Sequence, residues 1–159
     1  MKTLTHFFCV MVISFALLNC SSDDDSASTD KSSIEFLPED LNGTWKITFF
    51  LDENQERTSE FDGYLFTFNV DTEDVIITSD GNVDYGGVYP FQDEYDGKTE
   101  WVIEMDFNNA HNPGDADIQV LDEDWIVRKI VGNPIQIELE ESITNGTPDM
   151  LHMVKVDAN

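Results

Sequence analysis

Cysteine is almost absent from this chain of 159 residues, which contains 2 of them, Cys9 and Cys20. Beyond Cys20 there is no thiol, so that part of the chain can form neither a disulfide nor a cysteine-based zinc site. A domain built from the residues after Cys20 must therefore be held together by packing alone.

Basic residues are also scarce. The chain has 8 Lys and Arg against 33 Asp and Glu, and its formal net charge at pH 7 is −25. A negative charge of this size repels the phosphates of nucleic acids and anionic lipid surfaces. We therefore expect no nucleic acid partner, and we expect a soluble surface domain that attracts at most loosely held divalent cations.

Long apolar runs are lacking as well. The most apolar stretch, Phe7–Leu18, is interrupted only by Ser14. It is shorter than the roughly 20 residues that a helix needs to span a bilayer. Lys2 precedes this stretch and Cys20 closes it. A positive start, a short apolar region and a cleavage site are typical of a removable signal peptide, which we assign to residues 1–19.

The segment Leu17–Cys20 resembles the lipobox of bacterial lipoproteins, although Asn19 replaces the small residue that usually precedes the cysteine. The resemblance implies cleavage before Cys20 and attachment of acyl chains such as palmitate to this residue. Two or more acyl chains hold a protein stably at a membrane, so the resemblance predicts a lipid anchor in the outer membrane. The alternative is an ordinary secretory signal in which Cys20 is incidental.

The acidic run Asp23–Asp25 resembles the surface-export signal of lipoproteins from Bacteroidetes-type bacteria, and this implies a position on the cell surface. Alternatively, these aspartates only begin a solvated tether. Residues 21–33 are rich in Ser and Asp and cannot bury enough apolar surface to offset the entropy cost of ordering. We assign residues 20–40 to the lipidated cysteine and the tether, and residues 41–159 to one folded domain.

Apolar and polar residues alternate with period two through the folded domain, as is typical of strands with one buried and one solvated face. The clearest segments are 45–51, 64–70, 101–107 and 135–139, and weaker ones are 74–79, 85–92, 124–131 and 150–156. Asp-Gly and Asn-Gly pairs between them favour tight turns.

Short connections between these segments favour an antiparallel meander. We predict an all-β fold, an up-and-down meander that closes into an approximately eight-stranded barrel, because closure removes exposed strand edges. The longest connection, 108–123, is expected to contain one or two helical turns over 115–121. No long amphipathic helix is expected.

Several segments, in order along the chain, resemble the lipocalin-like domains of small Bacteroidetes lipoproteins. They are Leu41–Thr48 with its Gly-Thr-Trp, Phe61–Asn69, Leu121–Val127 with its Asp-Glu-Asp-Trp, Ile135–Leu139, and Asn145–Leu151. Gly86–Tyr89 departs from the family, which usually repeats Gly-Thr-Trp there. The resemblance implies that Trp45 closes one end of the barrel. Such a barrel is either filled by its own side chains or holds one small ligand.

Large side chains on the predicted inward faces are the candidate core. The positions that we expect to close the barrel or to form its core are Trp45, Phe66, Phe68, Trp101 and Trp125, and Phe49, Met105 and Phe107 are also expected to point inward. We interpret these side chains as core rather than as a cage for a ligand.

Residues suited to catalysis or metal binding are few. His111 lies among Asn, Ala and Pro residues, His152 alternates with Leu151 and Met153, and neither has an obvious Ser or Cys partner for nucleophilic catalysis. The segment Asp80–Asp84 begins like an EF-hand loop but lacks the Gly and the Glu that the loop requires farther on. We therefore expect no enzyme, no cofactor and no dedicated metal site.

Two hypotheses for function follow. The first is a surface lipoprotein whose lipocalin-like domain binds a small apolar ligand, a glycan or an envelope protein. The second is a structural or accessory subunit of an envelope complex, with a filled barrel and no small-molecule ligand. An enzyme that uses a pair of carboxylates is a weaker third hypothesis, which would require two clustered groups with divergent pKa values in a cleft.

Overall fold

The structure is a computed structural model that describes residues 35–108, 110, 114, 116–143 and 146–156. The predicted signal peptide, Cys20 and most of the tether lie outside the described residues, as does His111. No helix in the described part of the chain is long and apolar enough to cross a membrane.

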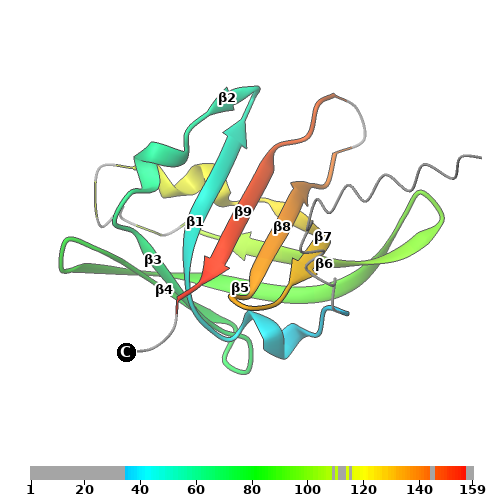
Figure 1. The fold of residues 1–159 in the computed structure, drawn as a ribbon, viewed down its shortest axis with the longest axis horizontal. Coiled ribbons are helices and arrows are strands. Elements are labelled where there is room, and N and C mark those ends of the chain that lie inside the picture. Colours follow the sequence, from blue (N-terminus) through cyan, green and yellow to red (C-terminus); the bar gives the residue numbers. More distant parts are fainter. Residues whose placement is uncertain (1–34, 109, 111–113, 115, 144–145, 157–159) are drawn as a thin grey trace, which may run out of the picture.

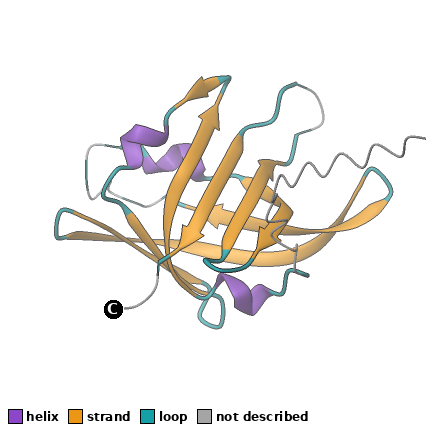
Figure 2. Cartoon of the chain, viewed as in Figure 1, coloured by secondary structure: helices purple, strands orange, loops and turns teal. Residues whose placement is uncertain are grey.

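Nine strands and three short 3₁₀ helices make up the described fold (Figures 1 and 2). The strands are β1 (Gly43–Asp52), β2 (Gln55–Glu56), β3 (Leu65–Asn69), β4 (Asp74–Ser79), β5 (Asn82–Tyr95), β6 (Lys98–Asp106), β7 (Asp124–Val131), β8 (Gln136–Glu141) and β9 (Met150–Lys155). The 3₁₀ helices are η1 (Pro38–Leu41), η2 (Thr58–Phe61) and η3 (Ile118–Leu121).

The strands form one antiparallel sheet in the order β2-β1-β3-β4-β5-β6-β7-β8-β9, and β9 pairs back onto β1. This last pairing runs from Trp45↔Lys155 to Leu51↔Met150 and closes an eight-stranded barrel. The predicted all-β meander with barrel closure is therefore confirmed. The short β2, which pairs only with the end of β1, is an extra strand that the alternation did not predict.

The hairpin of β5 and β6 is longer than predicted. These strands pair from Gly87↔Asp106 to Tyr95↔Lys98, whereas β6 pairs with β7 only from Val102↔Ile126 to Glu104↔Asp124. The far end of the hairpin consequently extends beyond the barrel wall (Figure 1). Phe36, which is 5 % exposed, packs edge-on against Trp101 with 5.8 Å between ring centroids.

Two tryptophans lie at opposite ends of the barrel, and each follows a 3₁₀ helix. The indole N–H of Trp45 donates to the carbonyl of Leu41 at 2.7 Å, and that of Trp125 donates to the carbonyl of Leu121 at 3.1 Å. Figure 2 shows η1 at one end of the barrel and η2 and η3 at the other. Both indoles are fully buried, so each hydrogen bond satisfies a polar group that water cannot reach.

Contacts from distant segments hold these ends in place. Lys155 donates from Nζ to the carbonyl of Asp40 at 3.0 Å and lies over the ring of Trp45 at 5.4 Å. At the other end, the backbone N–H of Ala116 donates to the hydroxyl of Tyr64 at 2.9 Å. The 3₁₀ helices are thus attached to the barrel by hydrogen bonds as well as by apolar packing.

The alternation in β1 is interrupted, which corrects the prediction for Phe49. The register of β1 against β9 shifts between Ile47 and Phe49, so Phe50 is fully buried in place of Phe49. Phe49 instead packs against His152, with 4.9 Å between ring centroids. A β-bulge inserts one residue into a strand and therefore exchanges the faces of the residues that follow it.

The two indole hydrogen bonds give a stability prediction. Trp45→Phe and Trp125→Phe should each lower the free energy of unfolding by roughly 2–4 kcal/mol, because each leaves a small cavity and an unpaired buried carbonyl. Urea melts followed by circular dichroism measure this loss. Trp101→Phe is the matched control, since Trp101 is half-buried and its indole donates to no described residue. Its cost should be roughly 1 kcal/mol or less. Equal losses at all three positions would contradict a special role for the hydrogen bonds.

Candidate functional site

The interior of the barrel is filled by its own side chains. The largest fully buried side chains are Trp45, Phe50, Phe66, Phe68, Phe107 and Trp125, together with smaller aliphatic ones. Aromatic rings meet across the interior, as in Phe50–Trp125 at 6.4 Å and Phe61–Phe66 at 6.4 Å. Packing of this kind occupies the volume in which a barrel would hold a small molecule.

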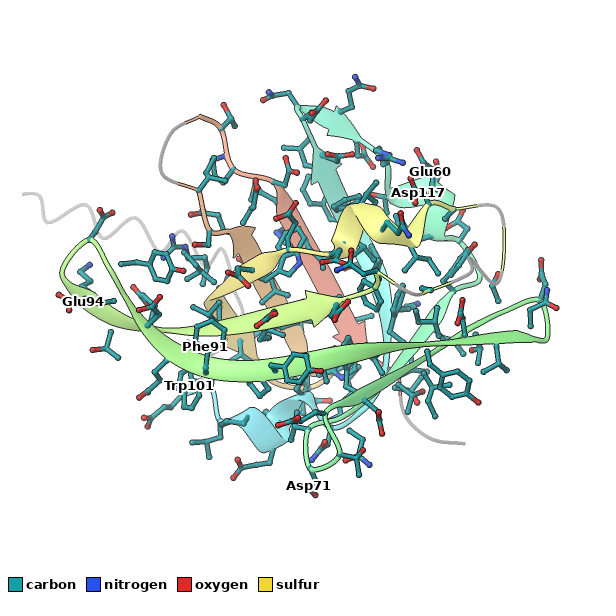
Figure 3. The ribbon with its side chains drawn as sticks, turned by 180° about the vertical axis from the view of Figure 1, so that it is seen from behind. Glu60, Asp71, Phe91, Glu94, Trp101 and Asp117 are labelled. Carbon is teal, nitrogen blue, oxygen red and sulfur yellow. The ribbon has the colours of Figure 1, made fainter. Side chains whose placement is uncertain are left out.

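The predicted core residues take two kinds of position. Trp45, Phe66, Phe68 and Trp125 are at most 2 % exposed and lie in the barrel interior. Trp101 lies half-buried beside the base of the projecting hairpin, where Figure 3 labels it near Phe91. Cys20, the predicted site of lipidation, is outside the described residues.

An opening on the outside of the barrel lies where β1 and β3 separate. These strands pair only from Gly43↔Phe68 to Trp45↔Phe66, and the opening beyond the last pair has a volume of about 510 Å³. Ile47, Phe61 and Tyr64 line it, and all three are at most 9 % exposed. The opening is thus a surface recess above a packed core.

The outer face of β3, β4 and β5 carries an unusual number of exposed apolar side chains. Of the seven large apolar residues that are exposed in the described chain, five are on these three strands: Leu65, Ile76, Val83, Tyr85 and Tyr89. Four of them, Leu65, Ile76, Val83 and Tyr85, lie side by side. The register pairs Leu65 with Thr78 and Thr78 with Val83, and pairs Thr67 with Ile76 and Ile76 with Tyr85.

We call these four residues, together with Thr67 and Thr78 that lie between them in the register, the β3–β5 face. None of them is charged, although the chain as a whole has 33 acidic residues. Contiguous exposed apolar surface of this kind marks sites of interaction with another molecule.

The turn at one edge of this face is the segment that resembles the start of an EF-hand loop. Asp80 and Gly81 both have positive φ angles, 50° and 83°, and they connect β4 to β5 as a two-residue hairpin turn. The backbone geometry of the turn explains why Asp and Gly occupy these two positions, because both central positions of such a turn favour Asp, Asn or Gly.

Carboxylates gather at the end of the barrel where β1 and β8 end and where β7 and β9 begin. Partial burial, with the negative charges of Glu141 and Asp149, raises the pKa of Glu123. Partial burial also raises the pKa of Asp149, against a backbone N–H donated by Glu53 at 2.8 Å. Both pKa values move in the same direction, whereas a general acid paired with a general base requires groups whose pKa values diverge.

No group of three or more His, Cys, Asp or Glu side chains among the described residues is arranged to hold a metal ion. His152 lies on the outer face of β9, half-buried against Phe49, and its Nε2 atom is buried without a hydrogen-bond partner in the described chain. No described Ser or Cys faces it as a nucleophile.

Period-two alternation alone does not reveal the β3–β5 face. In segments 74–79 and 85–92 the alternation is weak, because apolar residues occupy both faces of these strands. That pattern is itself a usable signal, since an outward row of apolar side chains next to an inward one predicts a strand whose outer face is covered or binds a partner.

The raised pKa of Glu123 gives a prediction for pH. A carboxyl group whose pKa is raised by folding destabilises the folded state above that pKa, and the penalty disappears as the pH falls through it. Glu123→Gln should therefore increase the free energy of unfolding at pH 7, by less than about 1 kcal/mol because the carboxyl group is only partly buried and solvent screens it. The gain should shrink as the pH approaches 4.5, the ordinary pKa of glutamic acid.

Urea melts at several pH values test this prediction, and Glu94→Gln at the hairpin tip (Figure 3) is the control. A gain that is the same at every pH would contradict it.

Comparison with protein-family models, with curated proteins and with solved structures gives no match to this chain. The relation to lipocalin-like domains of Bacteroidetes lipoproteins accordingly stays a prediction from the sequence motifs, and the β-barrel itself is what the structure establishes.

Proposed function

We propose that this chain is a lipid-anchored protein of the bacterial outer membrane, exposed at the cell surface, whose barrel is a rigid scaffold for binding a protein partner. In this proposal, Cys20 carries the lipid and the β3–β5 face contacts the partner. The function is that of an accessory or binding subunit of an envelope complex, and no reaction is assigned to it.

The β3–β5 face is the observation that carries this proposal. Val83 is 52 % exposed and Tyr85 63 %, and both lie on β5. When a partner removes exposed apolar side chains of this size from water, their burial stabilises the complex. An anionic membrane surface is disfavoured as the partner, because the net charge of −25 is repelled by it.

The filled interior argues for a partner on the outside rather than a ligand within. Phe50, Phe66 and Trp125 are at most 1 % exposed and occupy the space where the barrel of a ligand carrier is open. A small apolar ligand would have only the recess between β1 and β3, whose floor is already packed.

The lipid anchor can be tested with one substitution. Cys20→Ala should abolish incorporation of labelled palmitate and should release the protein from the membrane fraction, since no other residue beyond the signal peptide can be acylated through a thiol. Cys9→Ala is the matched control and should leave both the label and the fractionation unchanged. Palmitate incorporation that persists without Cys20 would contradict the anchor.

The binding face can be tested in intact cells. The double variant Leu65→Glu and Val83→Glu should reduce recovery of a crosslinked partner about 10-fold or more, because it places two charges in an apolar interface. Gln119→Glu with Thr147→Glu adds the same charge at exposed positions elsewhere and should have no effect.

Two outcomes would overturn the proposed function. One is equal crosslinking of the β3–β5 face variant and its control. The other is a small molecule that stays bound to the purified protein in a native mass spectrum and is released on unfolding, which would establish a ligand carrier instead.

A further inference from the structure

A glycine interrupts a row of outward-facing side chains on β5. The alternation of this strand turns Tyr85, Gly87 and Tyr89 to the outer surface, and the glycine leaves a gap between the two tyrosines. The register places Gly87 directly opposite Asp74 on β4 and opposite Asp106 on β6. The gap is therefore bounded by an aromatic residue on each side along the strand and by a carboxylate on each side across it.

The ring of Tyr89 leans over this gap. A Cβ atom on Gly87 would lie 2.9 Å from the hydroxyl oxygen of Tyr89 and 2.9 Å from Cε2 of the same ring. The neighbouring Gly86 faces inward, where a Cβ would lie 2.4 Å from Cδ1 of Phe107. Neither glycine can accept a larger side chain without moving an aromatic ring, because the Tyr89 ring packs on Gly87 and the Phe107 ring packs on Gly86.

The result is a shallow trough of about 300 Å³ on the outer surface. Tyr85, 63 % exposed, forms one side, and Tyr89, 37 % exposed, lies over the floor. The side chains of Glu73, Asp74 and Asp106 also line it. None of these three carboxylates forms an ion pair with a described residue, and Asp106 accepts one backbone hydrogen bond, from Asn108 at 3.0 Å.

We propose that this trough binds the guanidinium group of an arginine on a basic segment of the partner protein. The inference rests on the proposed function and names the chemistry of the partner, because Tyr85 belongs to both the trough and the β3–β5 face. The partner then contributes an apolar surface to the face and a positive charge to the trough.

The chemistry of the trough selects a planar cation. The face of a tyrosine ring attracts a cation within about 6 Å of its centre. Guanidinium stacks on aromatic rings and donates several N–H groups in one plane, which suits carboxylates placed on both sides of a ring. Carboxylates have only acceptors to offer, so an anionic group is repelled and a neutral sugar leaves their charge uncompensated.

The overall charge of the chain assists the encounter. A net charge of −25 draws a basic segment toward the protein, which raises the association rate at low salt. Attraction of this general kind acts over the whole acidic surface. Specificity for the trough must therefore come from the two tyrosines and the gap at Gly87.

The test uses the full-length protein, labelled with ¹⁵N and purified as its cells make it, and a capped tetra-arginine peptide as the probe. Peptide titration followed by NMR should shift the amide signals of Gly86 and Gly87 more than those of the hairpin tip at Glu94. A tetra-citrulline peptide, which has the same shape without the charge, should cause no shift at these glycines.

Three variants separate the trough from general attraction. Tyr85→Ala should weaken tetra-arginine binding about 3- to 5-fold, the loss of one cation–π contact. Asp74→Asn with Asp106→Asn should weaken it about 3- to 10-fold. Glu56→Gln with Glu94→Gln removes the same charge from exposed positions elsewhere and should leave the affinity within about 2-fold of the original.

Equal losses in the two double variants, or shifts spread evenly over the acidic surface, would overturn the proposal. Binding of a neutral oligosaccharide at the same glycines, without binding of tetra-arginine, would also overturn it. Failure of the trough leaves the proposed function standing if Leu65→Glu with Val83→Glu still reduces partner crosslinking about 10-fold or more. Conversely, arginine binding with unchanged crosslinking in that variant would sustain the trough and reject the β3–β5 face.

Discussion

The pairing of β9 with β1 is the constraint on which the rest of this structure depends. It joins the two ends of the meander and leaves every long strand with a neighbour on both sides. Closure also divides each strand into residues that face a small interior and residues that face water. The interior must then be filled, because no described cysteine can form a disulfide to compensate for poor packing.

Two short units of the same design fill the ends of the barrel. In each, a 3₁₀ helix ends in a buried leucine, and a tryptophan four residues later donates its indole N–H to the carbonyl of that leucine: Leu41 to Trp45, and Leu121 to Trp125. A tryptophan brings much apolar area but also a polar N–H that needs a partner when buried. The leucine carbonyl of the preceding helix is that partner, so the tryptophan enters the core with its indole N–H hydrogen-bonded. The same hydrogen bond attaches each helix to the barrel.

Because side chains fill the barrel interior, other molecules can contact this domain only at its outer surface. The chain has 33 acidic residues, and partial burial raises the pKa of two of them, Glu123 and Asp149, at one end of the barrel. Against this background, the uncharged β3–β5 face is an exception. Exposed apolar side chains of this kind add nothing to the core, and contiguous apolar patches on protein surfaces commonly mark interaction sites.

The sequence by itself determined the class of the fold, because period-two alternation and turn residues are local properties. It placed eight strands near their observed positions, placed Trp45 among the core candidates, and allowed a helical turn where η3 lies. Tertiary structure decided what alternation cannot encode: the bulge that exchanges Phe49 for Phe50, the length of the β5–β6 hairpin, and the filled interior. It also decided which residues from separate strands become neighbours, as Asp74 on β4 and Asp106 on β6 are both neighbours of Gly87. Such meetings depend on the register between strands, which is set by the packing of the whole barrel and not by any one segment.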